Sequence, residues 1–146
     1  MRNDFRSKLP KSLYTAEQTR ALDQCAIQVH GIPGLSLMER AGQACLDILL
    51  EQWPDCSTLA ICCGSGNNAG DGYVIARLAS AAGKKVVIYQ IGDMSKLKGD
   101  ALACAQRVSS LTVINIQERD DLERFRQGLN AADVVVDALL GTGLKG

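Results

Sequence analysis

The sequence lacks an excess of charge of either sign, because sixteen Lys and Arg balance sixteen Asp and Glu among its 146 residues. Proteins that bind nucleic acid through bulk charge need a surplus of Lys and Arg to contact phosphates, and anionic membranes attract polybasic segments. A run of about 18 apolar residues, which a membrane span requires, is also absent. The composition therefore predicts a protein that binds neither nucleic acid nor membranes.

Residues 1–18, MRNDFRSKLPKSLYTAEQ, lack the apolar core of a secretory signal, and Asp4 disfavours a mitochondrial presequence. We therefore expect a cytoplasmic protein in which residues 1–13 form a flexible segment. Histidine occurs once and C-x2-C pairs do not occur, so a zinc site is disfavoured. Cys25 and Cys45 fall on apolar faces of predicted helices, and we expect all six cysteines to be reduced and structural.

Two helices are predicted before residue 57. The first begins near Thr15, which forms a capping-box pattern with Gln18. The second begins at Ser36, with a capping box to Glu39, and Pro54 closes it. The apolar residues that recur at helical spacing in the first helix are Leu22, Ala26 and Val29.

From residue 57 onward, short runs rich in β-branched residues alternate with helical stretches. This alternation is typical of βαβ units and of a parallel sheet that is buried on both faces. Right-handed crossovers in such a sheet give the strand order 3-2-1-4, so the first and fourth strands are neighbours. Ligands bind beyond the carboxyl ends of strands at such a switch point, which places a site in the loops that leave these two strands. The predicted strands are 59–63, 85–91, 111–116 and 132–140, and the helices between them begin near Asp71, Lys98 and Asp120.

The loop after the first strand, within residues 63–79, contains four glycines, which permit positive φ and close approach of a ligand to the backbone. Its spacing Gly64-x-Gly66-x-x-x-Gly70 is one residue longer than the dinucleotide fingerprint, and the Gly-Lys-Ser/Thr of a P-loop is missing. Such a loop fits either phosphate binding at a helix N-terminus or a tight structural turn. Three polar side chains favour a ligand or an ion, although Asp71 also fits the role of helix N-cap. These side chains are Asn67, Asn68 and Asp71.

The loop after the fourth strand, residues 137–146, reads DALLGTGLKG. Asp137 follows a buried strand, where a carboxylate is costly unless it is paired, coordinated or satisfied by neighbouring backbone N–H groups. Residues 141–143 offer N–H donors for phosphate or ribose oxygens, and Lys145 is either a phosphate contact or a solvated surface lysine. Oxygen ligands from Asn68 and Asp137 suit a hard, large cation, and their low charge favours a monovalent ion.

Three stretches resemble one known family. LSLMERAG, GSGNNAGDGYVIAR and DALLGTGL, at residues 35–42, 64–77 and 137–144, occur in the order and spacing of the YjeF N-terminal domain family, the NAD(P)H-hydrate epimerases. The resemblance runs from about residue 14 to residue 146. It implies an α/β fold, a Rossmann-like three-layer α/β/α sandwich with a mostly parallel sheet, preceded by an N-terminal helical pair.

The resemblance implies an isomerase of nicotinamide nucleotide repair that interconverts the R and S epimers of NADHX and NADPHX. Its implied partner is an ADP- or ATP-dependent NAD(P)H-hydrate dehydratase, fused or separate, and a homo-oligomer is compatible with it. The implied cofactor is K⁺, with Asn68 and Asp137 as ligands. Asp137 is also our candidate catalytic acid or base, a role that competes with metal binding. The implied substrate-binding residues are Asn67, Asn68, Ala69, Gly70 and Asp71 in the first loop and Gly141, Thr142, Gly143, Leu144, Lys145 and Gly146 in the second.

Two other functions fit parts of the sequence. The same domain also serves as a non-catalytic ligand- or protein-binding scaffold, but the retained polar residues of the two loops speak against that role. A generic dinucleotide-binding half of an oxidoreductase is disfavoured, since Asp93 lies beyond Gly92 and the second strand has no acidic end.

The resembled domain continues with another helix and further strands. We therefore expect residues 14–146 to form a domain that is incomplete at its C-terminus, with 132–140 as an unpaired edge strand. From this expectation we predict that the isolated chain is poorly stable or inactive.

Overall fold

The computed structural model describes residues 12–141 and places four parallel strands in one sheet with the order β3-β2-β1-β4. This order is the one predicted from right-handed crossovers, and it confirms the α/β fold class. The strands are β1 (Thr58–Cys63), β2 (Lys85–Ile91), β3 (Thr112–Ile116) and β4 (Val134–Ala138). The helices are α1 (Ala16–Gln28), α2 (Gly34–Gln52), α3 (Asn68–Ala81), α4 (Gly99–Gln106) and α5 (Asp121–Asn130), with a short 3-10 helix η2 (Met94–Lys96) after β2.

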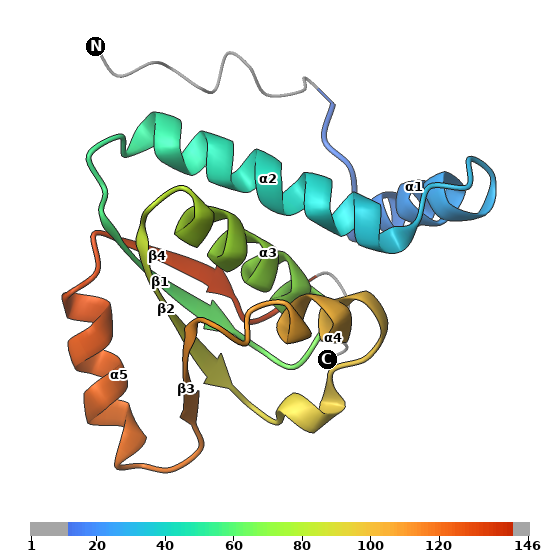
Figure 1. The fold of residues 1–146 in the computed structure, drawn as a ribbon. Helices are drawn as coiled ribbons and strands as arrows, with labels where there is room; N and C mark the ends of the chain where they lie inside the picture. Colours follow the sequence, from blue (N-terminus) through green and yellow to red (C-terminus); the bar gives the residue numbers. More distant parts are fainter. Residues whose placement is uncertain (1–11, 142–146) are drawn as a thin grey trace.

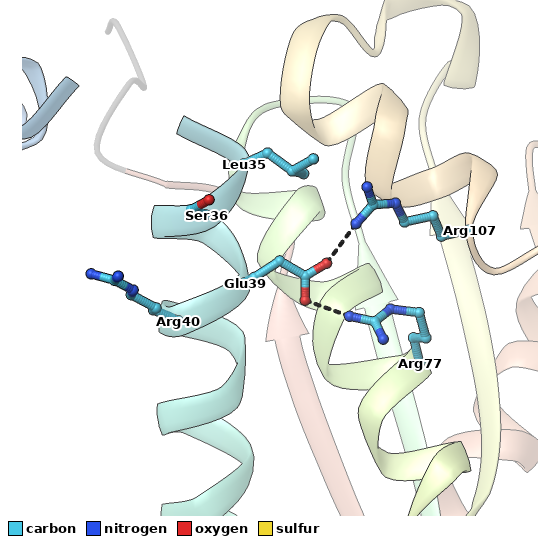
Figure 2. A pocket seen from close by; sticks show the side chains of 6 residues that line it. All are labelled: Leu35, Ser36, Glu39, Arg40, Arg77 and Arg107. Carbon is cyan, nitrogen blue, oxygen red and sulfur yellow. Dashed lines mark hydrogen bonds and ion pairs between the residues drawn. The ribbon is translucent and has the colours of Figure 1, made fainter. Parts of the chain in front are cut away.

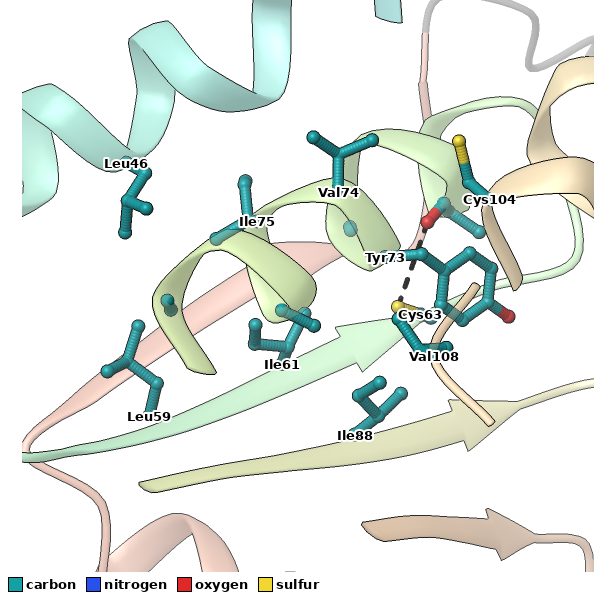
Figure 3. Packing of buried hydrophobic residues seen from close by; sticks show 14 of the residues in the cluster. Leu46, Leu59, Ile61, Cys63, Tyr73, Val74, Ile75, Ile88, Cys104 and Val108 are labelled. Atoms are coloured by element: carbon teal, nitrogen blue, oxygen red, sulfur yellow. Dashed lines mark hydrogen bonds between the residues drawn. The ribbon is translucent and has the colours of Figure 1, made fainter. Parts of the chain in front are cut away.

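The sheet carries helices on both faces, with α2, α3 and α4 over one face and α5 on the other (Figure 1). Successive residues of a strand point to opposite faces, so β1 contributes to two separate clusters. Leu59 and Ile61 point toward α3, where they pack in the larger cluster (Figure 3). Ala60 and Cys62 point toward α5 and join a smaller cluster built around Tyr89. This arrangement confirms the three layers.

Burial on both faces, which we predicted for the whole sheet, is wrong for β4. Every residue of β1 after the first is buried, but half-buried and exposed residues alternate along β4 until Ala138, which is buried. Val135 is 47% exposed because α5 packs beside β3 and β2 and leaves that face of β4 open. In the part of the chain that the structure describes, β4 pairs with β1 alone and forms an edge of the sheet.

The start of α1 is as predicted, and the start of α2 is not. Thr15 caps α1 with a full capping box: its Oγ1 accepts from the Gln18 backbone N–H at 3.2 Å, and its own N–H donates to the Gln18 side chain at 2.8 Å. α2 begins two residues before Ser36, and Pro33 at its N-cap makes no side-chain hydrogen bond. The predicted capping box is wrong because the Glu39 carboxylate is held by two arginines instead.

The apolar face predicted for α1 is not covered by the rest of the described chain. Leu22 is 53% exposed, Val29 is 73% exposed, and the helix has no buried residue. All six cysteines are free thiols, but Cys25 and Cys45 are exposed, so their predicted packing is wrong. Among residues 12–141, helices long and apolar enough to cross a membrane do not occur. The four buried cysteines are Cys56, Cys62, Cys63 and Cys104.

Candidate functional site

The loops after β1 and β4 meet at the carboxyl edge of the sheet, as the strand order predicts. β1 and β4 pair in parallel with Cys63 opposite Ala138. Just beyond this pair, the Gly64 N–H donates to the Ala138 carbonyl oxygen at 3.1 Å. The Asn68 side-chain N–H donates to the Leu140 carbonyl oxygen, also at 3.1 Å. A predicted site residue of the first loop is therefore bonded to the second loop.

The glycines of the first loop allow close packing rather than a left-handed backbone. None of the four has positive φ, so that part of the expectation is wrong. A Cβ added to Gly64 would lie 2.2 Å from the Leu139 carbonyl oxygen, and one added to Gly70 would lie 2.3 Å from the Met38 sulfur. The missing side chains thus let the second loop approach the first loop directly and let α2 approach α3.

A buried hydrogen-bonded network joins the first loop to β2 and α3. Gln90 of β2 is fully buried, and its side-chain N–H donates to the Gly64 carbonyl oxygen at 2.9 Å. The Tyr73 hydroxyl of α3 donates to the Gln90 side-chain oxygen. Because buried polar groups are costly unless they are paired, this network fixes where the loop leaves β1. Sequence analysis missed Gln90, whose one signal is a polar residue inside the apolar run KVVIYQI.

A cleft of about 590 Å³ lies between the two loops, a volume typical of small-molecule sites. Ala69 and Gly70 are buried in the first turn of α3 and do not line it, so their contact with a substrate stays a prediction. Thr142, Gly143, Leu144, Lys145 and Gly146 lie outside the described residues. The predicted residues that line the cleft are Asn67, Asn68, Asp71 and Gly141. Two residues that sequence analysis did not single out, Asp23 of α1 and Lys96 of η2, also line it.

Asp71 lies in the first turn of α3, but it is not the N-cap. The helix begins at Asn68, and Asn67 before it already has helical angles, φ −63° and ψ −33°, so the N-cap interpretation of Asp71 is wrong. Burial, and then the nearby Asp23 carboxylate, raise the pKa of Asp71 to about 6. The cleft therefore contains a carboxyl group that is ready to exchange a proton near neutral pH.

Asn68 and Asp137 border one cavity of about 340 Å³ between α2, α3 and β4. Asp137 lies within β4 and is exposed, so the expectation of a costly buried carboxylate is wrong. Its Oδ1 accepts from the Leu139 N–H at 3.0 Å, which confirms the alternative of a neighbouring backbone donor.

The side-chain nitrogen of Asn68 donates to the second loop, which leaves the side-chain oxygen as an acceptor. One carboxylate and one amide oxygen fit a hard cation of low charge better than a transition metal. Within residues 12–141, groups of three or more His, Cys, Asp or Glu side chains that could hold a metal ion are absent.

A third hollow, of about 610 Å³, lies between α2, α3 and α4 (Figure 2). Glu39 of α2 accepts hydrogen bonds from Arg77 of α3 and, at 2.9 Å, from Arg107 at the end of α4. Arg40 points to the other side of α2. Glu39, Arg77 and Arg107 are therefore paired with one another, and they tie three helices together.

Comparisons with known proteins cover most of the chain. The family described as YjeF-related protein N-terminus matches residues 34–146. The chain is 41% identical to a bifunctional NAD(P)H-hydrate repair enzyme Nnr of Coxiella burnetii, over 92% of this chain and 26% of that protein. It is 40% identical to an NAD(P)H-hydrate epimerase of Roseobacter litoralis, over 91% of this chain and 65% of that protein. The chain thus spans less than two thirds of either relative.

A solved structure shows the same fold. The crystal structure of yeast ynu0, YNL200c, matches with a TM-score of 0.77 over 92% of this chain and 59% of that chain. At 20% sequence identity the match shows the shared architecture alone.

Proposed function

The chain belongs to the family of YjeF-related protein N-termini, and on this premise we propose that it is an NAD(P)H-hydrate epimerase. In the proposed reaction it interconverts the R and S epimers of NADHX and NADPHX, the hydrated forms of the two nicotinamide cofactors. The observation that carries the proposal is the cleft at the switch point, where Asn68 joins the two predicted loops. Relatives named as epimerases and as bifunctional repair enzymes support it.

The proposed reaction serves a second enzyme. An ADP- or ATP-dependent dehydratase consumes the S epimer, either as a fused domain or as a separate protein. Support comes from a relative named as a bifunctional repair enzyme, of which this chain spans 26%, and from one named as an epimerase, of which it spans 65%. The proposed location is the cytoplasm, whose reducing conditions suit six free cysteines.

Epimerisation at C6 of the nicotinamide ring requires the C6–O bond to break and water to return from the other face. The lone pair of the ring nitrogen assists departure of the oxygen and leaves a cationic ring. The protein must therefore supply proton transfer and negative charge close to the ring. The carboxylates that line the cleft suit this task, and Lys96 supplies a positive charge for a phosphate of the substrate.

Asn68 and Asp137 are the residues that would hold K⁺ in this proposal. Bound there, the ion would supply a fixed positive charge that offsets the Asp137 carboxylate. Its binding is measurable without turnover: K⁺ should raise the melting temperature of the protein more than Li⁺ at equal ionic strength. Asn68→Ala should abolish the difference between the two ions, whereas the exposed Asn130→Ala at the end of α5 should preserve it.

The epimerase is tested by a coupled repair assay on the full natural polypeptide. A mixture of R- and S-NADPHX is incubated with excess S-specific dehydratase and its nucleotide, and NADPH absorbance is followed with spontaneous epimerisation subtracted. Recovery that runs rapidly past the S fraction to completion is the expected result. A stall at the S fraction would contradict the epimerase and favour a binding scaffold.

A further inference from the structure

Two carboxylates from separate parts of the chain face the same space. Asp23 of α1 and Asp71 of α3 both line the cleft of about 590 Å³ and a smaller cavity of about 190 Å³ beside it. Asn67 also borders both spaces, so these three side chains form the wall between them. α1 has no buried residue, yet it places Asp23 at the first turn of α3.

The surroundings of Asp71 are mainly acidic. Among residues 12–141 this half-buried carboxyl group forms no salt bridge. Burial and Asp23 raise its pKa to about 6, close to the pH at which a proton donor and acceptor works best. The titratable groups that line the same cavities as Asp71 are Asp23 from α1, Cys45 from α2, Asp100 from α4, Lys96 from η2 and Asp137 from β4.

We propose that Asp71 is the catalytic residue that carries the proton to and from the C6 oxygen of the substrate, and that Asp23 is a positioning residue that acts through it. The inference rests on the proposed epimerase function and adds the residues that perform it. It leaves Asp137 to the cation, so one carboxylate no longer has to serve as both metal ligand and base.

The proton and electrons balance without an outside reactant. The Asp71 carboxylic acid donates its proton to the C6 oxygen, and the C6–O bond breaks with its electron pair on oxygen, which leaves as water. The ring nitrogen lone pair forms the N1=C6 bond, and the two aspartates stabilise the cationic ring. Water then adds to the opposite face of C6, the nitrogen recovers its lone pair, and the proton lost by that water returns to the carboxylate pair.

The test compares Asp71→Asn and Asp23→Asn with the wild type in the full natural polypeptide. Asp71→Asn should lower kcat by at least about 100-fold while KM for NADPHX changes little, because the amide keeps the shape but cannot exchange the proton. The exposed Asp47→Asn on α2, whose carboxylate accepts from Gln43, is the matched control and should retain full activity.

Asp23→Asn should act through the pH profile. Without the Asp23 charge the pKa of Asp71 falls, so the protonated form is lost at lower pH. The alkaline limb of the pH profile of kcat should therefore move to lower pH in Asp23→Asn. In Asp23→Glu, which keeps the charge, the limb should lie close to its wild-type position. A merely structural role for Asp23 would lower kcat at every pH without moving the limb.

The outcomes separate the two proposals. A wild type that does not carry recovery past the S fraction overturns the epimerase and this inference together. A wild type that does so, with Asp71→Asn retaining more than a tenth of its kcat, overturns the inference and leaves the epimerase standing. If Asp71→Asn fails to fold, the pH profile of Asp23→Asn decides, and an unmoved alkaline limb overturns the inference.

Discussion

At the scale of single residues, the hydrogen bonds of Gln90 decide how the glycine-rich loop is held. Replacing Gln90 with Leu would leave the Gly64 carbonyl oxygen and the Tyr73 hydroxyl buried without their partner. We expect a loss of about 1–3 kcal/mol in the free energy of unfolding, which urea denaturation would measure. Gln127→Leu, on the exposed side of α5, should change it by less than about 0.5 kcal/mol. Equal losses in the two variants would contradict the prediction.

The Asp133 carboxylate links the start of β1 to the start of β4. Its Oδ2 accepts from the backbone N–H groups of Ser57 and Thr58, both at 2.8 Å, and these bonds lower its pKa in the folded protein. A lowered folded-state pKa stabilises the protein above the unfolded value of about 3.9, and the contribution disappears as pH falls through the folded value.

The melting temperature of Asp133→Asn should therefore lie below that of the wild type at pH 7, and the gap should close as pH falls below about 4. Thermal melts at a series of pH values check this, with the exposed Asp47→Asn as the control. A gap that is constant from pH 7 to pH 3 would show that charge on Asp133 is not the cause.

At the scale of elements, the Glu39 carboxylate joins α2 to α3 and α4. Glu39→Gln would weaken the bonds to Arg77 and Arg107 and leave two guanidinium groups close together. Because all three side chains are partly exposed, we expect a modest loss of about 1 kcal/mol in unfolding free energy. The matched control is Glu123→Gln, whose exposed pair with Arg126 lies within α5 and should contribute less. A larger effect at Glu123 would refute a role for Glu39 in joining helices.

The sequence predicts elements better than it predicts their boundaries and partners. Thr15 and Gln18 are three residues apart, so their capping box is visible in the sequence and is present in the structure. The Ser36 and Glu39 pattern is equally good locally, but two arginines distant in sequence bind Glu39 instead. Gln90 escaped notice for the same reason, since its partner Gly64 lies 26 residues away.

Two loops of the candidate site could be located from strand order alone, because the switch point follows from the handedness of crossovers. The position of Asp23 at the site could not be predicted in this way. It depends on how α1 lies against the first turn of α3, and no pattern within α1 encodes that contact. The exposure of Asp137 also depends on a tertiary fact, namely that α5 covers other strands.

At the scale of the whole molecule, the described chain leaves apolar surface uncovered on the edge strand β4. Val135 of this strand is 47% exposed, and Leu140 beyond it is 68% exposed. Exposed apolar edges promote association between chains, and charged residues oppose it. Val135→Lys should therefore lower light scattering of the 146-residue chain at high concentration, while Thr112→Lys on the opposite edge strand, β3, should have less effect. Equal scattering by wild type and Val135→Lys would contradict this prediction.

The pairing of β1 with β4 also sets the order in which the site can be completed during synthesis. Asn68 and Leu140 are 72 residues apart in sequence, although a single hydrogen bond joins them. A ribosome makes β1, α3 and β2 well before β4, so the nascent chain holds the glycine-rich loop with its hydrogen-bonding partner still unsynthesised. Closing so long a stretch of chain is among the later events of folding. We therefore expect the cleft to be one of the last features of the domain to form, so that ligand binding would report on the arrival of its fourth strand.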